Sequence, residues 1–309
     1  MRRAALLALL LCGCGGAPEL TVRAGELVAT VRGNEPDADP MDGPPSGLSR
    51  LSWRGGASPF ASAGLNLEHV FAAHPDPRNG FGPRAGRLEL VPLAGGDGAT
   101  LVRRREEDPW PVSTRLTYEL VAPSYVDFEL EATIHDASQF QPEDLVVFFL
   151  ASYVEGASDV ELSFRGLPGP GQPEQWVRTR PRGKEAGETY VPLDSPGLPP
   201  HPEDVHLQLN AGHEDWPRIA RPYCFGRVGE MVLALFLDVL RSEDEEVRFT
   251  VMRWRAHEGR PAWDLGWVVH ELHDGKTARL RGRLLWKPFV SEEDVTREYE
   301  AWRAALPPR

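Results

Sequence analysis

One stretch, residues 66–84, concentrates side chains that can transfer protons or form hydrogen bonds. Its prolines and glycines predict a loop for much of its length, and loops on a rigid sheet often carry binding groups. Carboxylate and imidazole groups can exchange protons with a ligand, while guanidinium and amide groups can fix its hydroxyls. The alternative is a set of ordinary ion pairs around a half-buried histidine. The candidates are Glu68 and His69 for proton transfer, and Arg78, Asn79 and Arg84 for substrate binding.

Two further clusters combine aromatic with polar side chains. Tyr223 and Arg227 precede a strongly apolar segment and could face a cleft. Trp263 and Asp264 lie in an alternating segment, which would place them on opposite faces of a strand. An exposed tryptophan can support a sugar ring, and a carboxylate can accept hydrogen bonds from its hydroxyls. Core packing is the alternative for the tryptophan. We add these four residues and Tyr153 to the candidate binding groups.

Several well-known reaction motifs are missing from the sequence. The segment from His270 to His273 lacks the spacing of the zinc helix motif, and His69 with His74 would be the better pair of metal ligands. There is no Gly-x-Ser-x-Gly elbow, no phosphate loop and no dinucleotide-binding glycine pattern. We therefore expect neither a metal ion nor a cofactor.

Alternation of apolar and polar residues dominates the chain beyond residue 47. In the segment 125–133, for example, Val126 and Phe128 fall on one face while charged residues fall on the other. Ten or more such segments separated by turn signals predict an all-β fold, a large antiparallel β-sandwich. One α-helix is expected at the end, over 291–305. We expect a single domain over residues 48–309.

The chain begins with a pattern that is typical of secreted bacterial lipoproteins. Two arginines precede a short apolar run, which is the layout of a signal peptide. The run ends at Gly13-Cys14, which resembles the lipobox where the cysteine receives a lipid and becomes the new N-terminus. The alternative is an ordinary signal peptide with incidental cysteines. We expect a signal peptide over 1–13, lipidation of Cys14, and a flexible tether over 14–47 that contains at most an edge strand at 26–32.

Composition and charge narrow the possible partners. The formal net charge is −12, and loss of two arginines with the leader would make the mature chain still more acidic, which argues against nucleic acid. No second apolar segment is long enough to span a bilayer, so we expect the protein to be attached to the membrane by the lipid on its N-terminal cysteine. We expect an exported monomer in the cell envelope. The absence of aspartate directly after Cys14 favours the outer membrane.

Five segments spread along the chain carry a further signal, namely GLNLEHVF at 64–71, ASYV at 151–154, FGRVGEM at 225–231, PAWD at 261–264 and KPFVSEED at 287–294. Together they resemble an uncharacterised family of secreted proteins of the planctomycete type. This resemblance implies no particular activity.

More distantly, the length, the all-β pattern and the histidine and glutamate candidates resemble the supersandwich of galactose-mutarotase-like proteins. In that group a histidine acts as an acid and a glutamate as a base on the anomeric centre of a sugar. The resemblance implies such roles for Glu68 with His69 or His135, although no motif matches residue by residue. It is an analogy of fold.

Two functions remain open at this point. The first is a protein that binds or processes carbohydrate in a cleft on one sheet, either as a mutarotase-like or epimerase-like enzyme or as a glycan-cleaving one. The second is a non-catalytic envelope module that binds or scaffolds other components. Convergence of the candidate side chains in one place would favour the first function. A large exposed apolar patch would favour the second.

Overall fold

The computed structural model describes residues 9–11, 17–34, 44–80, 84, 86–155, 161–180, 186–198, 207, 211–253 and 261–307. All pairings between neighbouring strands in this part of the chain are antiparallel, and they form sheets of four, five and nine strands. The all-β sandwich with one C-terminal helix is therefore confirmed.

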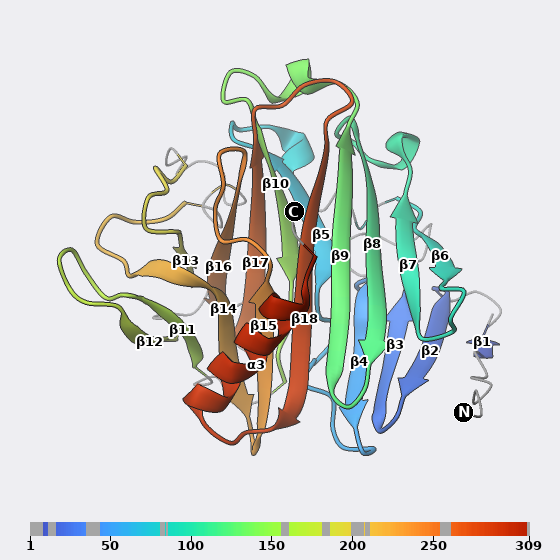
Figure 1. Ribbon diagram of the computed structural model, residues 1–309. Helices are drawn as coiled ribbons and strands as arrows, with labels where there is room; N and C mark the ends of the chain where they lie inside the picture. Colours follow the sequence, from blue (N-terminus) through green and yellow to red (C-terminus); the bar gives the residue numbers. More distant parts are fainter. Residues whose placement is uncertain are drawn as a thin grey trace.

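The nine-stranded sheet forms one layer of the sandwich (Figure 1). In spatial order it contains β12 (Gln175–Thr179), β11 (Leu162–Leu167), β14 (Arg218–Val228), β15 (Met231–Leu237), β18 (Thr277–Pro288), β9 (Tyr125–Ile134), β8 (Val112–Val121), β7 (Gly98–Arg103) and β6 (Glu89–Pro92).

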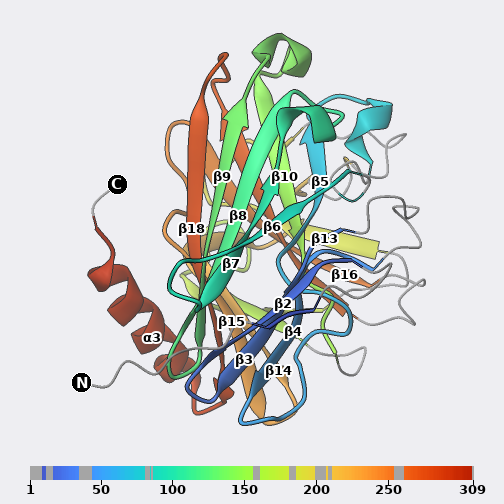
Figure 2. The same cartoon turned by 90° about the vertical axis from the view of Figure 1, so that its right-hand side faces the viewer.

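The second layer consists of the two smaller sheets, which lie behind the nine-stranded sheet in Figure 1 and beside it in Figure 2. An isolated bridge between Leu48 and Gly64 links them. The five-stranded sheet has the order β13 (Ala186–Tyr190), β16 (Glu245–Arg253), β17 (Pro261–His270), β10 (Leu145–Ala151) and β5 (Asn66–Ala72), and the four-stranded sheet has the order β1 (Leu9–Leu11), β2 (Glu19–Ala24), β3 (Leu27–Arg32) and β4 (Gly47–Trp53).

One hydrophobic core joins the two layers and contains side chains from all three sheets. Strand β9 contributes Val126, Phe128, Leu130 and Ala132, whose neighbours along the strand are only half-buried, so the predicted alternation is confirmed. The five-stranded sheet differs, because β5 and β10 are buried on both faces. A second apolar cluster, with Phe71, Phe149 and Leu198 among its members, covers its outer face.

The expected helix is present as α3 (Glu292–Ala305). The Ser291 side chain caps its first turn by accepting a hydrogen bond from the Asp294 N–H group. The apolar face of α3 packs on the outer face of the nine-stranded sheet, through Val295, Tyr299 and Trp302 (Figure 2). No helix of the described residues is long and apolar enough to cross a membrane.

The N-terminal region differs from the expected tether. Residues 17–34 contain β2 and β3, and their side chains Leu20, Val22 and Val31 are fully or almost fully buried in the main core. The sequence indicated one edge strand here, yet the region forms a hairpin that also pairs with β4. The folded part therefore begins well before residue 48. Cys14 lies outside the described residues.

Candidate functional site

Glu68 is the centre of a buried polar cluster on the five-stranded sheet. The pairing of β5 with β10 shifts register at this point, since His69 is opposite Phe149 while Leu67 is opposite Leu150. Glu68 is thus the extra residue of a bulge, and bulges commonly redirect side chains next to functional sites. The residue is 2 % exposed.

Two side chains bind this carboxylate. The Tyr153 hydroxyl lies 2.7 Å from Oε1 and 2.8 Å from Oε2 of Glu68, and donates its hydrogen bond to the carboxylate. The Arg84 Nη1 atom donates to Oε1 over 2.8 Å. Three of the predicted site residues therefore meet, although Tyr153 lies far from Glu68 and Arg84 in the sequence. We call Glu68, Arg84, Tyr153 and Asp264 the Glu68 cluster.

Asp264, on β17, is the second buried carboxyl group of this cluster. Its Oδ1 accepts a hydrogen bond from the Ser152 backbone N–H group over 2.9 Å. Burial raises its pKa well above the usual range, the Ser152 hydrogen bond opposes the rise, and the charge of Glu68 adds to it. Sequence reasoning missed Ser152, whose hydroxyl also accepts from the Leu65 N–H group and thereby ties β10 to the start of β5.

Burial also raises the pKa of Glu68, against the opposing effects of Arg84 and Tyr153. The pKa of Tyr153 is raised by burial first and by Glu68 second. The tyrosine therefore stays protonated and acts as a donor, while the two carboxyl groups are biased toward the protonated form. Buried carboxyl groups with raised pKa values and specific partners are candidates for proton transfer.

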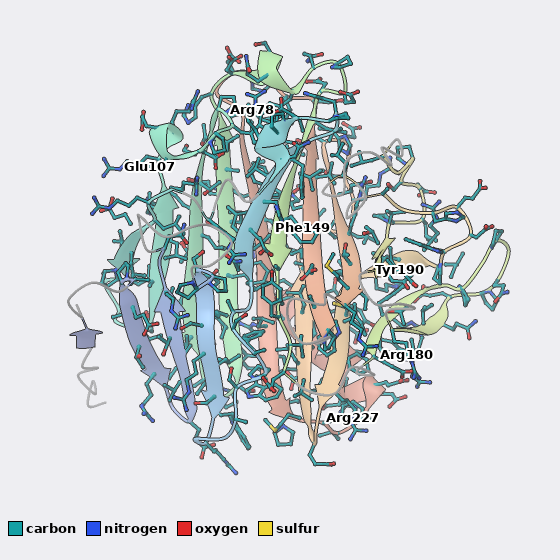
Figure 3. All side chains as sticks on the ribbon, turned by 180° about the vertical axis from the view of Figure 1, so that it is seen from behind. Arg78, Glu107, Phe149, Arg180, Tyr190 and Arg227 are labelled. Atoms are coloured by element: carbon teal, nitrogen blue, oxygen red, sulfur yellow. The ribbon has the colours of Figure 1, made fainter. Side chains whose placement is uncertain are left out.

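His69 follows Glu68 but points into the second apolar cluster. Its ring stacks on Phe71 with centroids 5.0 Å apart and meets Phe149 edge-on at 5.6 Å. Figure 3 shows Phe149 near the middle of this layer, seen from behind. The histidine is 2 % exposed, so aromatic packing accounts for its position.

Arg78 and Asn79 shape the turn that follows β5. The guanidinium group of Arg78 binds Asp76 and lies over the Trp110 ring, 3.8 Å from its centroid. The side-chain oxygen of Asn79 accepts from the Ala72 N–H group, while its amide nitrogen donates to a backbone oxygen in the turn. These contacts hold the turn together, and the role of both residues in substrate binding stays a prediction.

His135 lies on the other layer, just after β9, where its Nε2 atom is 2.9 Å from the Ser113 hydroxyl. The Glu68 cluster is on the five-stranded sheet, and none of the described contacts joins it to His135. The pairing of these two residues that the mutarotase analogy implies is therefore not part of this cluster.

Tyr223, Arg227 and Trp263 also lie apart from Glu68. Tyr223 is buried under α3, and Arg227 lies over Phe289 at 4.7 Å, both on the nine-stranded sheet. In Figure 3, Arg227 and Arg78 are at opposite ends of the molecule. Trp263 packs in the core between the layers, where its ring occupies the space that a side chain on Gly226 would need. A single cleft that gathers all the predicted residues is thus not what the structure shows.

No cluster of three or more histidine, cysteine, aspartate or glutamate side chains arranged to hold a metal ion occurs among the described residues. Cys224 is buried, and burial raises the pKa of its thiol, so it behaves as a core residue.

Comparison with known proteins gives similarity of fold. No family model matches the chain and no curated protein does, so the expected planctomycete-type family has no support from them. Among solved structures, a TPR-domain containing protein from Parabacteroides distasonis has a TM-score of 0.50 at 7% identity, over 89% of this chain and 48% of that one. Galactose 1-epimerase from Lactobacillus acidophilus has a TM-score of 0.48 at 12% identity, over 93% and 99%.

The GalM/aldose epimerase homologue from C. elegans has a TM-score of 0.45 at 9% identity, over 89% of this chain and 100% of that one. Aldose epimerases are thus among the similar solved structures, as the distant resemblance to galactose-mutarotase-like proteins led us to expect. At such low identities the similarity concerns the arrangement of the strands alone.

Proposed function

We propose that the protein is an exported, lipid-anchored carbohydrate-binding protein whose Glu68 cluster binds a sugar and exchanges protons with it. The observation that carries the proposal is the buried Glu68 carboxylate, held by Tyr153 and Arg84 beside a second buried carboxyl group on β17. A sugar hydroxyl both donates and accepts hydrogen bonds, so it can bind to tyrosine, guanidinium and carboxyl groups at once.

The chemistry proposed for Glu68 is general acid–base catalysis. A carboxyl group works best in this role when its pKa lies closer to neutral pH, which is the direction in which burial moves Glu68. Tyr153 stays protonated and orients the carboxylate by donating a hydrogen bond to it. Arg84 limits the rise of the pKa, so the group can still ionise.

The replacement Glu68→Gln keeps the shape of the side chain and removes the exchangeable proton. We expect wild-type protein to be stabilised by at least one of D-galactose, D-glucose, D-mannose and N-acetyl-D-glucosamine, by about 2.7 kcal/mol at 100 times the dissociation constant. We expect any exchange of the α and β anomers that the protein catalyses to slow by about 100-fold or more in the variant. Thermal melting and one-dimensional NMR measure the two effects.

The matched control is Glu26→Gln, because Glu26 is paired with Arg54 on the surface. This variant should melt and bind as the wild type does. Absence of stabilisation by every sugar, or equal stabilisation of wild type and Glu68→Gln, would contradict the proposal.

The proposed anchor has its own test. In a bacterial host, the full chain should incorporate labelled palmitate and fractionate with membranes, because the lipobox-like Gly13-Cys14 provides the acceptor thiol. Cys14→Ala should lose both properties, whereas Cys12→Ala should keep them. Labelling that survives Cys14→Ala would remove the anchor from the proposal.

The alternative, a non-catalytic envelope module, would be favoured by a large exposed apolar patch, and the described residues show none. The large exposed hydrophobic side chains among the described residues are Val91, Leu193 and Val290, which belong to three separate segments.

A further inference from the structure

Two adjoining grooves lie between α3 and the strands at one edge of the nine-stranded sheet. The first has a volume of about 750 Å³ and the second about 510 Å³, both within the range of small-molecule sites. Glu293, on α3, lines both of them, so they form one continuous surface. The α3 residues that line them span 292–300, roughly 13 Å along the helix axis. We call this surface the α3 groove.

The charges of the α3 groove nearly balance. Among the described residues, the first groove is lined by Arg178, Arg180 and Arg227 against three glutamates. The second is lined by three arginines, again against three glutamates. Because Glu293 lines both parts, the whole groove has six arginines against five glutamates, a formal charge of +1, so it does not strongly favour an anion or a cation. A neutral ligand fits it best.

Several of these charged groups are already paired with one another. Arg178 binds Glu292 at 2.5 Å, which joins β12 to α3. Glu174 accepts from both Arg165 and Arg221. A guanidinium group has five donors, so a paired arginine can still donate to a ligand while its carboxylate partner accepts. Hydrogen-bond donors beside acceptors suit a ligand with many hydroxyl groups, because each hydroxyl both donates and accepts a hydrogen bond.

Aromatic rings form the floor of the second part of the groove. Trp176, on β12, is half-buried and meets Tyr223 edge-on at 5.9 Å. Tyr299 of α3 stacks on Tyr223, with centroids 4.6 Å apart. Sequence reasoning missed Trp176, because nothing in its own segment indicates that α3 lies beside it.

The wall that α3 provides is rigid, which lowers the entropy cost of binding. Lys287 of β18 binds Asp294 at 2.8 Å and also binds Glu298. The Tyr125 hydroxyl donates to Glu298 over 2.6 Å. The groove is therefore formed before any ligand arrives.

We infer that the α3 groove is a second binding site, which holds a neutral oligosaccharide chain. Its length favours an extended ligand over a single ring, and its nearly balanced charge favours an uncharged one. Its aromatic floor beside donor–acceptor pairs is suited to sugar rings with hydroxyls. The site lies on the outer face of the nine-stranded sheet, whereas the Glu68 cluster belongs to the other layer (Figures 1 and 2). It positions the protein on a glycan without acting on it.

The test titrates the full chain with maltohexaose, cellohexaose, chitohexaose and xylohexaose by calorimetry. At least one should bind, and hydrogen exchange should slow in β12 and α3 in its presence. Trp176→Ala should weaken that binding by about tenfold or more. Arg221→Gln, which changes a side chain 57 % exposed and leaves the core intact, should weaken it as well.

The matched control is Trp53→Ala, since Trp53 is also half-buried and has an arginine over its ring, but it lies on β4. The Trp53→Ala variant should bind the hexasaccharide with the affinity of the wild type. Hydrogen exchange should slow in β12 and α3 but not in β5, which separates this site from the proposed Glu68 site. The inference is overturned if no hexasaccharide binds, or if one binds equally well to wild type, Trp176→Ala and Arg221→Gln.

Discussion

Replacing Arg103 with methionine is expected to lower the free energy of unfolding by about 3–5 kcal/mol. Arg103 and Asp108 form an ion pair whose side chains are both 0 % exposed, with Nε and Oδ2 2.8 Å apart. Burial lowers the pKa of Arg103 and raises that of Asp108, and the charge of each residue opposes the shift of the other. Methionine fills much of the volume but leaves Asp108 without its cation. Urea unfolding, followed by circular dichroism, measures the loss.

The neighbouring residue provides the control. Arg104 binds Glu89 at 3.0 Å, but its side chain is 71 % exposed, so Arg104→Met should cost less than about 1 kcal/mol. Adding Asp108→Asn to Arg103→Met should restore part of the stability, because the unpaired charge is then gone. Equal losses for the two arginine variants would show that burial does not decide the strength of these pairs.

The same two arginines show what local sequence can reveal. Alternation along β7 places Ala99, Leu101 and Arg103 on one face, and all three are buried. The alternation thus identifies which residue of the run 103–105 turns inward. It does not identify the partner, since Asp108 reaches Arg103 through the short helix that follows β7.

Strand β16 shows where alternation misleads. Its polar residues Glu246, Arg248 and Thr250 alternate with apolar ones, a pattern that is typical of a half-exposed strand. All three are buried, and Glu246 accepts a hydrogen bond from Ser195, about fifty positions earlier in the chain. Burial of this face depends on segments that are remote in sequence, which periodicity cannot detect.

The candidate site was predictable only where its residues are close in sequence. Glu68 and Arg84 are close in sequence, and their loop-rich segment indicated that they would meet. Tyr153 and Asp264 join them because β10 lies between β5 and β17 in the sheet. Trp263 is the neighbour of Asp264 and was predicted to be a site residue from the same segment. Successive side chains of a strand point to opposite faces, so Trp263 packs in the core instead.

Asp264→Asn is expected to alter the dependence of stability on pH. Burial holds the folded-state pKa of Asp264 well above the value near 4 of an unfolded chain. Between those two values the native state binds this proton and the unfolded state does not, so the stability of the wild type falls as pH rises through that interval. One such group contributes at most about 1.4 kcal/mol per pH unit. Asparagine does not titrate, so the fall should be shallower in the variant.

Urea unfolding between pH 4 and pH 8 measures the difference between wild type and variant at each pH. The pKa of Glu68 is raised too, so the variant should keep some fall of its own, and only the difference isolates Asp264. Asp215→Asn is the control, because that side chain is 83 % exposed and its removal should leave the wild-type slope unchanged. A parallel pair of curves for wild type and Asp264→Asn would mean that the Asp264 carboxyl ionises as easily in the folded protein as in the unfolded chain. The proposed Glu68 cluster would then lose one of its two proton-holding groups, because a carboxyl group that ionises freely near pH 4 has no proton to exchange at neutral pH.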